Sequence, residues 1–365
     1  MNDLKHLELR KELLARIRRG EFPEGRLDSE PELCRRYGLS RSTVRRTLGE
    51  LEAEGLLRRV RGKGTFLRIG GGPGAPRVAF IVYDTAYLCH RVTSSILQGI
   101  DSALAPAGIL LDVLASRRTA RDEKFSQLAR RYAGLLIGAW QLEEEFAEEL
   151  KGTSLPWYFV KNYLPGMEER AFRIDYRQGG ALAARELLAQ GRRRFAFLCD
   201  SRSRIADDLL AGIGDALGGS GAGLPAENVR WIDERTPAAR EAAVGELFRR
   251  AERPDALICF HDGLAAAAIE ICRDFGLAAP RDFGIVGCND ELVAAYLDPS
   301  LTSLRLPTFE AGVAAGRAIA AAIRGETPPA VPPPFPVELI RRLSTAPLLP
   351  AGDPREIREK VPGND

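Results

Sequence analysis

The sequence of 365 residues lacks any apolar run long enough to span a membrane, since a transmembrane helix needs about 20 consecutive apolar residues. Its first residues combine apolar positions with acidic ones, which is typical of an amphipathic helix and not of a signal sequence. We therefore expect a cytoplasmic protein that does not contact a membrane.

Paired cysteines and clustered histidines are also missing. The chain has six cysteines and three histidines, and none of the cysteines forms a Cys-x-x-Cys pair. Scattered cysteines inside apolar runs are typical of reduced, buried thiols. The sequence predicts no metal site and no cofactor.

Lysine is almost absent after residue 63, where only Lys124, Lys151, Lys161 and Lys360 remain. None of these lies in a motif that supports a Schiff base, which an aminotransferase-like body needs. We also find no nucleophile elbow, no phosphate-binding loop and no paired catalytic carboxylates. These absences disfavour an enzyme.

Charge is divided unevenly along the chain. Residues 1–69 hold 17 Lys and Arg against 11 Asp and Glu, a net charge of +6, whereas the remainder holds 35 against 39, a net charge of −4. The overall net charge of +2 therefore conceals a basic head on a mildly acidic body.

The head has the pattern of a helix–turn–helix. Apolar residues recur every fourth position in a first helix over about residues 4–19. Ser29 and Glu32 have the spacing of a capping box for a short second helix, which Gly38 ends. Ser40 is placed to cap a third helix over about residues 41–54.

The third helix divides into two faces. Val44, Leu48 and Leu51 recur on one side, which predicts a buried face. The opposite side is cationic and carries hydroxyl groups, as a recognition helix in a DNA major groove requires. The candidate DNA contacts are Ser40, Arg41, Ser42, Thr43, Arg45 and Arg46.

A basic turn follows this helix. Leu57–Val60 and Thr65–Leu67 predict two short strands, and the turn between them carries Arg61, Gly62 and Lys63. Glycine lets the backbone approach a sugar-phosphate strand, and the two cations supply charge. A solvated basic surface with an ordinary hairpin is the alternative.

These residues closely resemble the winged helix–turn–helix of GntR-type bacterial regulators. The blocks L-S-R-S-T-V-R-R-T-L, E-G-L-L and G-K-G-T-F occur at the family's spacing within about residues 4–68. The resemblance implies DNA contacts by the third helix and by Gly62. Two positions depart from the family: Asp28 replaces its usual Pro, and Pro31 replaces an Arg that often contacts DNA.

From residue 77 short apolar runs alternate with helical segments. This alternation predicts parallel sheets covered on both faces by helices, with a ligand at the carboxyl ends of the strands. The expected strands are Val78–Val82, Ile109–Leu114, Leu135–Ala139, Trp157–Val160, Phe195–Cys199, Ala256–Phe260 and Phe283–Gly287. The expected helices lie near residues 92–105, 120–132, 142–151, 177–190, 205–217, 238–251, 263–275 and 309–324.

The body resembles the LacI-type effector domain, a relative of periplasmic sugar-binding proteins. The motifs that carry the resemblance include A-L-I-C-F-H-D, G-I-V-G-C-N-D and D-P-S-L-T-S-L, within about residues 77–348. The expected fold is therefore α/β, with an N-terminal winged helix–turn–helix and a two-lobed periplasmic-binding-protein-like domain with two parallel sheets. A GntR-type head on a LacI-type body most resembles arabinose-repressor-type regulators.

The resemblance implies a small ligand between the lobes and suggests its contacts. Asn289 matches a ligand-contacting acidic position of the family, and Asp290 matches a neighbouring structural one. His261 replaces a ligand-contacting Asn, whereas Asp262 begins the next helix and is placed to cap it. The candidate effector contacts are Tyr83, Tyr87, His90, Asp175, Arg235, His261 and Asn289.

One departure bears on ligand identity. Leu209 occupies the position of a family Arg that clamps a ligand oxygen, three residues before Gly212. The ligand therefore need not be a common hexose, and a nucleobase stays an alternative to a sugar. A degenerate body that only dimerises is a further alternative.

The expected organisation is a head over residues 1–69, a Gly/Pro linker over 70–76, an effector-binding and dimerisation domain over 77–348 and a tail over 349–365. The expected N-lobe comprises about 77–188 and 303–327, and the C-lobe about 189–302 and 328–348. We expect a homodimeric regulator that binds a palindromic double-stranded DNA operator. A small polar effector, most simply a sugar, should control this binding. We expect repression, with activation as the alternative.

Overall fold

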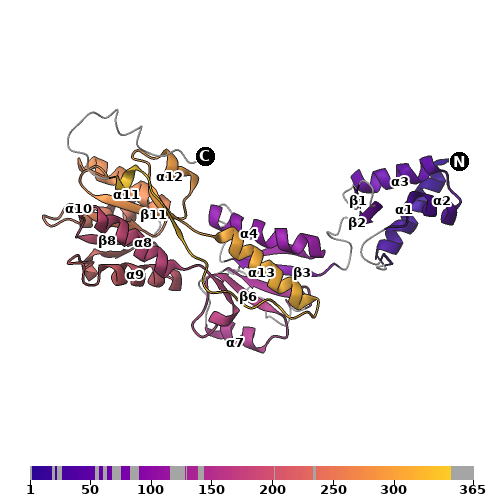
Figure 1. Cartoon of the computed structure of the whole chain (residues 1–365), viewed down its shortest axis with the longest axis horizontal. Coiled ribbons are helices and arrows are strands. Elements are labelled where there is room, and N and C mark those ends of the chain that lie inside the picture. The colour runs from indigo at the N-terminus through magenta and orange to yellow at the C-terminus, as the bar shows by residue number, and fades with distance from the viewer. Residues whose placement is uncertain are drawn as a thin grey trace. The chain divides into compact units, whose positions relative to one another are not determined.

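The computed structural model describes residues 2–18, 21–22, 27–53, 57–60, 64–67, 75–82, 90–115, 128, 130–138, 144–200, 202–232 and 236–346. Among these residues no helix is both long and apolar enough to cross a membrane. The chain is shown in Figure 1.

The head consists of three helices and a hairpin. These are α1 (Asn2–Arg18), α2 (Glu30–Tyr37), α3 (Arg41–Ala53), β1 (Leu57–Val60) and β2 (Gly64–Leu67). The two strands are antiparallel, and Leu57 pairs with Leu67. The predicted apolar face of α3 is confirmed, because Val44, Leu48 and Leu51 are fully buried in the head's core with Leu9, Leu13 and Leu33.

The predicted ends of α2 are confirmed. The Ser29 backbone N–H donates to Glu32 Oε2 at 2.7 Å within a capping box. Gly38 ends the helix with φ = 62°, a left-handed conformation that glycine adopts at little cost. These caps fix the two ends of α2, and Gly38 begins the short connection to α3.

Asp28, the unexpected residue before this cap, joins α1 to α2. Its carboxylate accepts from Arg16 Nη1 at 2.8 Å and from Arg36 Nη1 at 3.4 Å. Arg16 is buried, and its guanidinium also stacks over the Phe22 ring at 4.5 Å. A buried guanidinium needs such partners, since an unpaired buried charge is strongly destabilising.

The first sheet of the body has the order β4-β3-β5-β6-β7. Its strands are β3 (Arg77–Val82), β4 (Leu110–Ala115), β5 (Gly134–Ile137), β6 (Trp157–Lys161) and β7 (Ala171–Arg173). β3 is parallel to β4 and β5, and β5 is parallel to β6. The central strands β3 and β5 are buried, as expected for strands covered on both faces, whereas the edge strand β4 is only partly buried.

Helices α4 (Arg91–Leu104) and α13 (Thr308–Ile323) lie side by side near this sheet (Figure 1). A Cβ at Gly99 would lie 2.2 Å from the Phe309 carbonyl oxygen, and one at Gly312 would lie 2.4 Å from that of Ile96. The two helices therefore approach as closely as their backbones allow. A further helix, α7 (Glu144–Gly152), precedes β6.

The second sheet has the order β13-β12-β11-β10-β8-β9, and only the pairing of β13 with β12 is antiparallel among its described pairs. Its strands are β8 (Phe195–Cys199), β9 (Val229–Trp231), β10 (Ala256–Cys259), β11 (Gly284–Cys288), β12 (Thr302–Arg305) and β13 (Glu338–Ile340). Two parallel-dominated sheets in an α/β arrangement confirm the predicted fold class.

Helices cover both faces of the second sheet. They are α8 (Tyr176–Ala189), α9 (Arg204–Leu217), α10 (Pro237–Phe248) and α11 (Asp262–Asp274), with the short α12 (Leu292–Tyr296) after β11. Alternate strand residues such as Leu198, Leu257 and Ile285 form one core cluster with α10 and α11. α8 packs on the strands from the other face, and α9 packs on α8.

The chain divides into two compact units, the first of which includes the head, at positions that differ from the lobe boundaries expected for the body. Unit 1 comprises residues 1–161, 165–172 and 309–331, and unit 2 comprises 162–164, 173–308 and 332–365. α8 was expected in the N-lobe, but it packs on α9 and the second sheet and so belongs to unit 2. Residues 303–308 belong to unit 2 as well, because β12 pairs with β11.

The contact between α8 and α9 gives a test of this packing. A Cβ at Gly212 would lie 1.8 Å from the Arg177 carbonyl oxygen, so Gly212→Ala should lower the free energy of unfolding of unit 2 by about 1–3 kcal/mol. Thermal unfolding of the full chain measures this change.

Gly214→Ala on the same helix is the matched control. No atom lies within 4 Å of a Cβ at Gly214, and the residue is exposed. Alanine should therefore raise stability there by up to about 1 kcal/mol through helix propensity. Equal effects of the two substitutions would contradict close packing of α8 on α9.

Candidate functional site

Three hydroxyl groups meet at the N-terminus of α3. Ser40 Oγ lies 2.9 Å from Ser42 Oγ and 2.8 Å from Thr43 Oγ1, and it accepts from the Thr43 backbone N–H at 3.3 Å. The predicted cap by Ser40 is thus confirmed. Hydroxyls and free backbone N–H groups at a helix N-terminus suit a phosphate oxygen. Ser40 and Ser42 are exposed, whereas Thr43 is buried.

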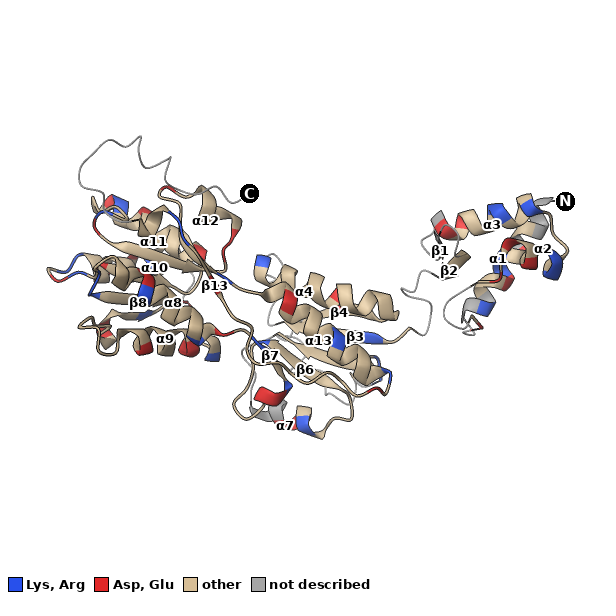
Figure 2. Ribbon diagram, in the orientation of Figure 1, with Lys and Arg blue, Asp and Glu red and all other residues tan. Residues whose placement is uncertain are grey.

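The three arginines of α3 are exposed but differ in their partners. Arg45 Nε donates to Glu30 Oε2 at 2.8 Å, and Arg46 Nε donates to Glu50 Oε1 at 3.2 Å. Arg41 has no carboxylate partner among the described residues. Figure 2 shows basic and acidic residues interspersed over α2 and α3. Arg41 can therefore reach a base edge or a phosphate without first breaking an ion pair.

The predicted basic turn of the hairpin, with Arg61, Gly62 and Lys63, lies outside the described residues. So do Tyr83, Tyr87 and Arg235, the linker at 70–74, most of the expected helix over 120–132 and the tail at 349–365. Roles at these positions stay predictions.

The parallel strands of unit 2 bring polar residues to one edge of the sheet. Asp200 follows β8, His261 follows β10 and Asn289 follows β11, and these three strands are neighbours. Because the helices of a parallel sheet return from the carboxyl edge, the N-termini of α8 and α11 lie at this edge too. Asp175 is the N-cap of α8, so it is at the same edge.

His261 is fixed in one orientation by two hydrogen bonds. Its Nδ1 accepts from the Leu264 backbone N–H at 3.1 Å, and its Nε2 lies 3.1 Å from Asp200 Oδ2. Because Nδ1 accepts, the ring proton sits on Nε2 and is donated to Asp200. His261, and not Asp262 as predicted, is therefore the N-cap of α11.

Asn289 begins a strained turn after β11. Asn289 and Asp290 have φ values of 104° and 48°, a region that costs energy for residues other than glycine. Strain of this kind is concentrated at functional sites. Asp290 is structural, as predicted, because its carboxylate accepts from Arg305 Nε at 2.9 Å and from Arg342 Nη2 at 2.6 Å.

The Asp262 carboxylate holds the same turn through hydrogen bonds. This carboxylate is fully buried and accepts from the Glu291 backbone N–H at 2.6 Å and from Ser303 Oγ at 2.5 Å. Ser303 Oγ in turn accepts from the Asp290 backbone N–H at 3.0 Å. Burial raises the pKa of Asp262 from 3.8 to about 7, against the opposing effect of its two donors.

The remaining predicted contacts have the following surroundings. Asp175 accepts from the Gln178 backbone N–H at 2.8 Å as a helix cap. His90 is the exposed N-cap residue of α4 in unit 1. Leu209 is fully buried, and its side chain lies beside Gly179 of α8. It packs in the core of unit 2 and offers no polar group to a ligand.

Sequence reasoning did not select Asp200 or an aromatic cluster at the end of β9. Asp200 directly follows the apolar run Phe195–Cys199, which is a signal that could have found it. Arg202 lies over the Trp231 ring at 5.1 Å. Tyr163 Oη donates to Asp208 Oδ2 at 2.8 Å, a contact between residues 45 positions apart that sequence reasoning did not predict.

Comparison with known proteins identifies both parts of the chain. Residues 5–67 match the model of the bacterial regulatory proteins of the gntR family. Residues 184–345 match the periplasmic binding protein-like domain.

Relatives match over most of the chain. The arabinose metabolism transcriptional repressor of Geobacillus stearothermophilus is 29% identical over 324 residues, which cover 85% of this chain and 89% of that protein. The HTH-type transcriptional regulator GalR of Escherichia coli K12 is 31% identical over 228 residues, which cover 61% of this chain and 66% of that protein.

Solved structures of transcriptional regulators have a similar fold. A transcription regulator GntR from Chromobacterium violaceum is 26% identical with a TM-score of 0.64, covering 74% of this chain and 99% of that chain. The fold is also similar to that of a CelR–cellobiose complex, with a TM-score of 0.67 at 24% identity, covering 83% of this chain and 90% of that chain.

The fold and these matches define a DNA-binding transcriptional regulator. More particularly, the chain is a regulator with a GntR-type winged helix–turn–helix head and a LacI-type, periplasmic-binding-protein-like body. The predicted family is thereby confirmed.

The buried carboxylate of Asp262 predicts a pH dependence of stability. Its pKa is raised from 3.8 to about 7 in the folded chain, so the folded state binds the proton more tightly than the unfolded state. This contribution to stability is full below about pH 4 and is lost as pH rises through about 7. The loss reaches at most about 1.4 kcal/mol per pH unit.

Asp262→Asn should remove this contribution, since an amide does not titrate. The free energy of unfolding, measured from pH 5 to 8, should fall less steeply with pH in the variant than in the wild type. Asp274→Asn, which changes an exposed carboxylate at the end of α11, is the control. Identical slopes in Asp262→Asn and wild type would refute the raised pKa.

Proposed function

We propose that this regulator is a repressor whose affinity for operator DNA is controlled by a small polar effector, a sugar, bound at the carboxyl edge of the unit 2 sheet. The observation that carries the proposal is the convergence of Asp200, His261 and Asn289 at the ends of three neighbouring strands. Ligands of open α/β sheets bind outside the carboxyl ends of the strands.

The chemistry of this edge suits a polyhydroxylated ligand. The Asn289 amide offers both a donor and acceptors, which can pair with hydroxyl groups. The Asp200 side chain is only 5% exposed and holds the His261 ring in place beside this edge. Relatives at 25–29% identity are named for arabinose metabolism, and their matches cover 84–85% of this chain. These names support a sugar over a nucleobase, which stays the second candidate because Leu209 replaces the ligand-clamping Arg.

We further propose that the chain acts as a homodimer. The exposed side of α12 is apolar: Leu292 is 69% exposed, Val293 41% and Tyr296 80%. An apolar patch of this kind on a small helix favours association. Two heads on a dimer would read the two halves of a palindromic operator.

The proposal assigns no catalysis to the chain. Its relatives are named as transcriptional regulators, and the sequence offers no arrangement of nucleophile and base. Whether a given promoter is repressed or activated depends on where the operator lies, and repression is proposed because the arabinose relatives are repressors.

The role of α3 in DNA binding is tested with Arg41→Ala. The operator is first selected by the full-length chain from a random duplex library, and binding is then followed by fluorescence anisotropy. Loss of a guanidinium that reaches a base edge should weaken specific binding by about 1–3 kcal/mol.

Arg281→Ala removes an exposed arginine of unit 2 and is the charge-matched control. It should leave operator affinity unchanged. If both variants bind as the wild type does, Arg41 has no part in recognition.

The effector site is tested with Asn289→Gly. Glycine is chosen because Asn289 has φ = 104°, so that the amide is removed without adding backbone strain. Among pentoses, hexoses, sugar acids and polyols, at least one should raise the melting temperature of the wild type. A ligand at 100 times its Kd stabilises the folded state by about 2.7 kcal/mol.

The rise in melting temperature caused by the sugar should be lost in Asn289→Gly. It should be retained in Asp274→Ala, because Asp274 lies at the opposite edge of the sheet. Stabilisation by nucleobases alone would favour the second candidate. A sugar response that survives Asn289→Gly would place the ligand elsewhere.

A further inference from the structure

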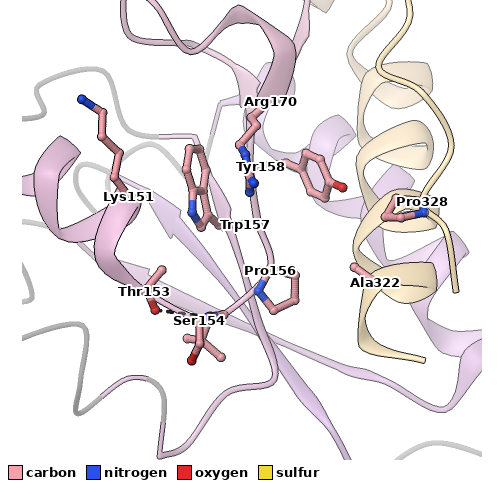
Figure 3. Close-up of a pocket in the computed structure, with 10 residues that line it drawn as sticks. Lys151, Thr153, Ser154, Pro156, Trp157, Tyr158, Arg170, Ala322 and Pro328 are labelled. Atoms are coloured by element: carbon pink, nitrogen blue, oxygen red, sulfur yellow. Dashed lines mark hydrogen bonds between the residues drawn. The ribbon is translucent and has the colours of Figure 1, made fainter. Parts of the chain in front are cut away.

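Unit 1 contains a pocket that the proposed effector site does not use. Its volume is about 540 Å³, within the range of small-molecule sites. It lies between the end of α7, the start of β6, the residue before β7 and the end of α13 (Figure 3). Its polar and aromatic lining residues are Lys151, Thr153, Ser154, Trp157, Tyr158 and Arg170.

The lining of this pocket is positively charged. Lys151 and Arg170 line it, and none of the described residues in its lining is acidic. Lys151 Nζ is paired with Glu148 at 2.7 Å on the exposed surface of α7. Arg170, by contrast, has no carboxylate partner among the described residues, and its guanidinium lies over the Trp157 ring at 4.6 Å.

Two neutral donors of the pocket are open to water. Trp157 is only 5% exposed, but its indole N–H is not among the buried groups that lack a partner. Ser154 is an exposed residue. Both groups can therefore donate to a ligand in place of water.

We propose that this pocket binds a small phosphorylated metabolite, a phosphate monoester. A phosphate group carries a charge between −1.5 and −2 at about neutral pH and three acceptor oxygens. It would pair with the Arg170 guanidinium, while the Trp157 N–H and the Ser154 hydroxyl offer further donors along the lining. The volume exceeds that of the phosphate, so an organic group can fill the space beside Tyr158 and Pro328.

The pocket and the proposed effector site belong to different units. The pocket adjoins the start of β6, and therefore the amino edge of the unit 1 sheet, whereas the effector residues follow strands of unit 2. Residues 75–76, which lead from the head, enter β3 at this same amino edge, because β3, β5 and β6 are parallel. A ligand here would thus act as a second signal beside the sugar.

The test measures binding to the full-length chain by calorimetry and thermal unfolding. The probes are inorganic phosphate, a panel of pentose and hexose phosphates and the parent sugars, compared with sodium chloride at equal ionic strength. At least one sugar phosphate should bind more tightly than inorganic phosphate. Arg170→Gln should weaken its binding about tenfold or more, since charge-assisted hydrogen bonds are the strong ones.

Arg324→Gln is the matched control, because Arg324 follows α13 in unit 1 but is paired with Glu326 and does not line the pocket. The Arg324→Gln variant should bind the sugar phosphate with the same affinity as the wild type. If Arg170→Gln fails to fold, Trp157→Phe keeps an aromatic ring and removes the N–H, and it should weaken binding about twofold to tenfold.

The proposal is independent of the sugar site, because phosphate binding should persist in Asn289→Gly. No response beyond that to sodium chloride would overturn it. So would equal responses in Arg170→Gln and wild type, which would indicate non-specific ion binding, or equal affinity for a sugar and its phosphate.

Discussion

The buried carboxylate of Asp262 is the interaction on which the proposed effector site depends. It joins the start of α11 to the turn after β11 and to β12, through Glu291 and Ser303. The turn that it supports carries Asn289 in a backbone conformation that few residues adopt without strain. Burial makes the charged carboxylate costly, and its two donors offset part of that cost in this arrangement of the three segments.

The head also depends on a buried charged group that needs partners. Arg16 is buried and must have partners, and Asp28 supplies one at the point where the chain turns into α2. The capping box at Ser29 and the left-handed Gly38 then set the ends of α2. These local constraints fix α3, so that Ser42 and the three arginines face solvent while Val44 and Leu48 are buried.

Much of this architecture follows from the sequence because its signals are local. The apolar runs predicted β3, β8, β10 and β11, and the spacing of Ser29 and Glu32 predicted the capping box. The short strands β7, β9, β12 and β13 were missed, since strands of three or four residues with Arg, Thr or Glu carry little periodic signal.

Contacts between distant segments could not be read in the same way. The pairing of His261 with Asp200 joins residues 61 positions apart, and the pocket of unit 1 collects residues from four elements.

The most direct test of the account is to titrate the operator-bound chain with the sugar that stabilises it. The account predicts that operator affinity falls by about 5- to 150-fold in the wild type and does not change in Asn289→Gly. Operator affinity that is unaffected by every stabilising sugar would contradict it.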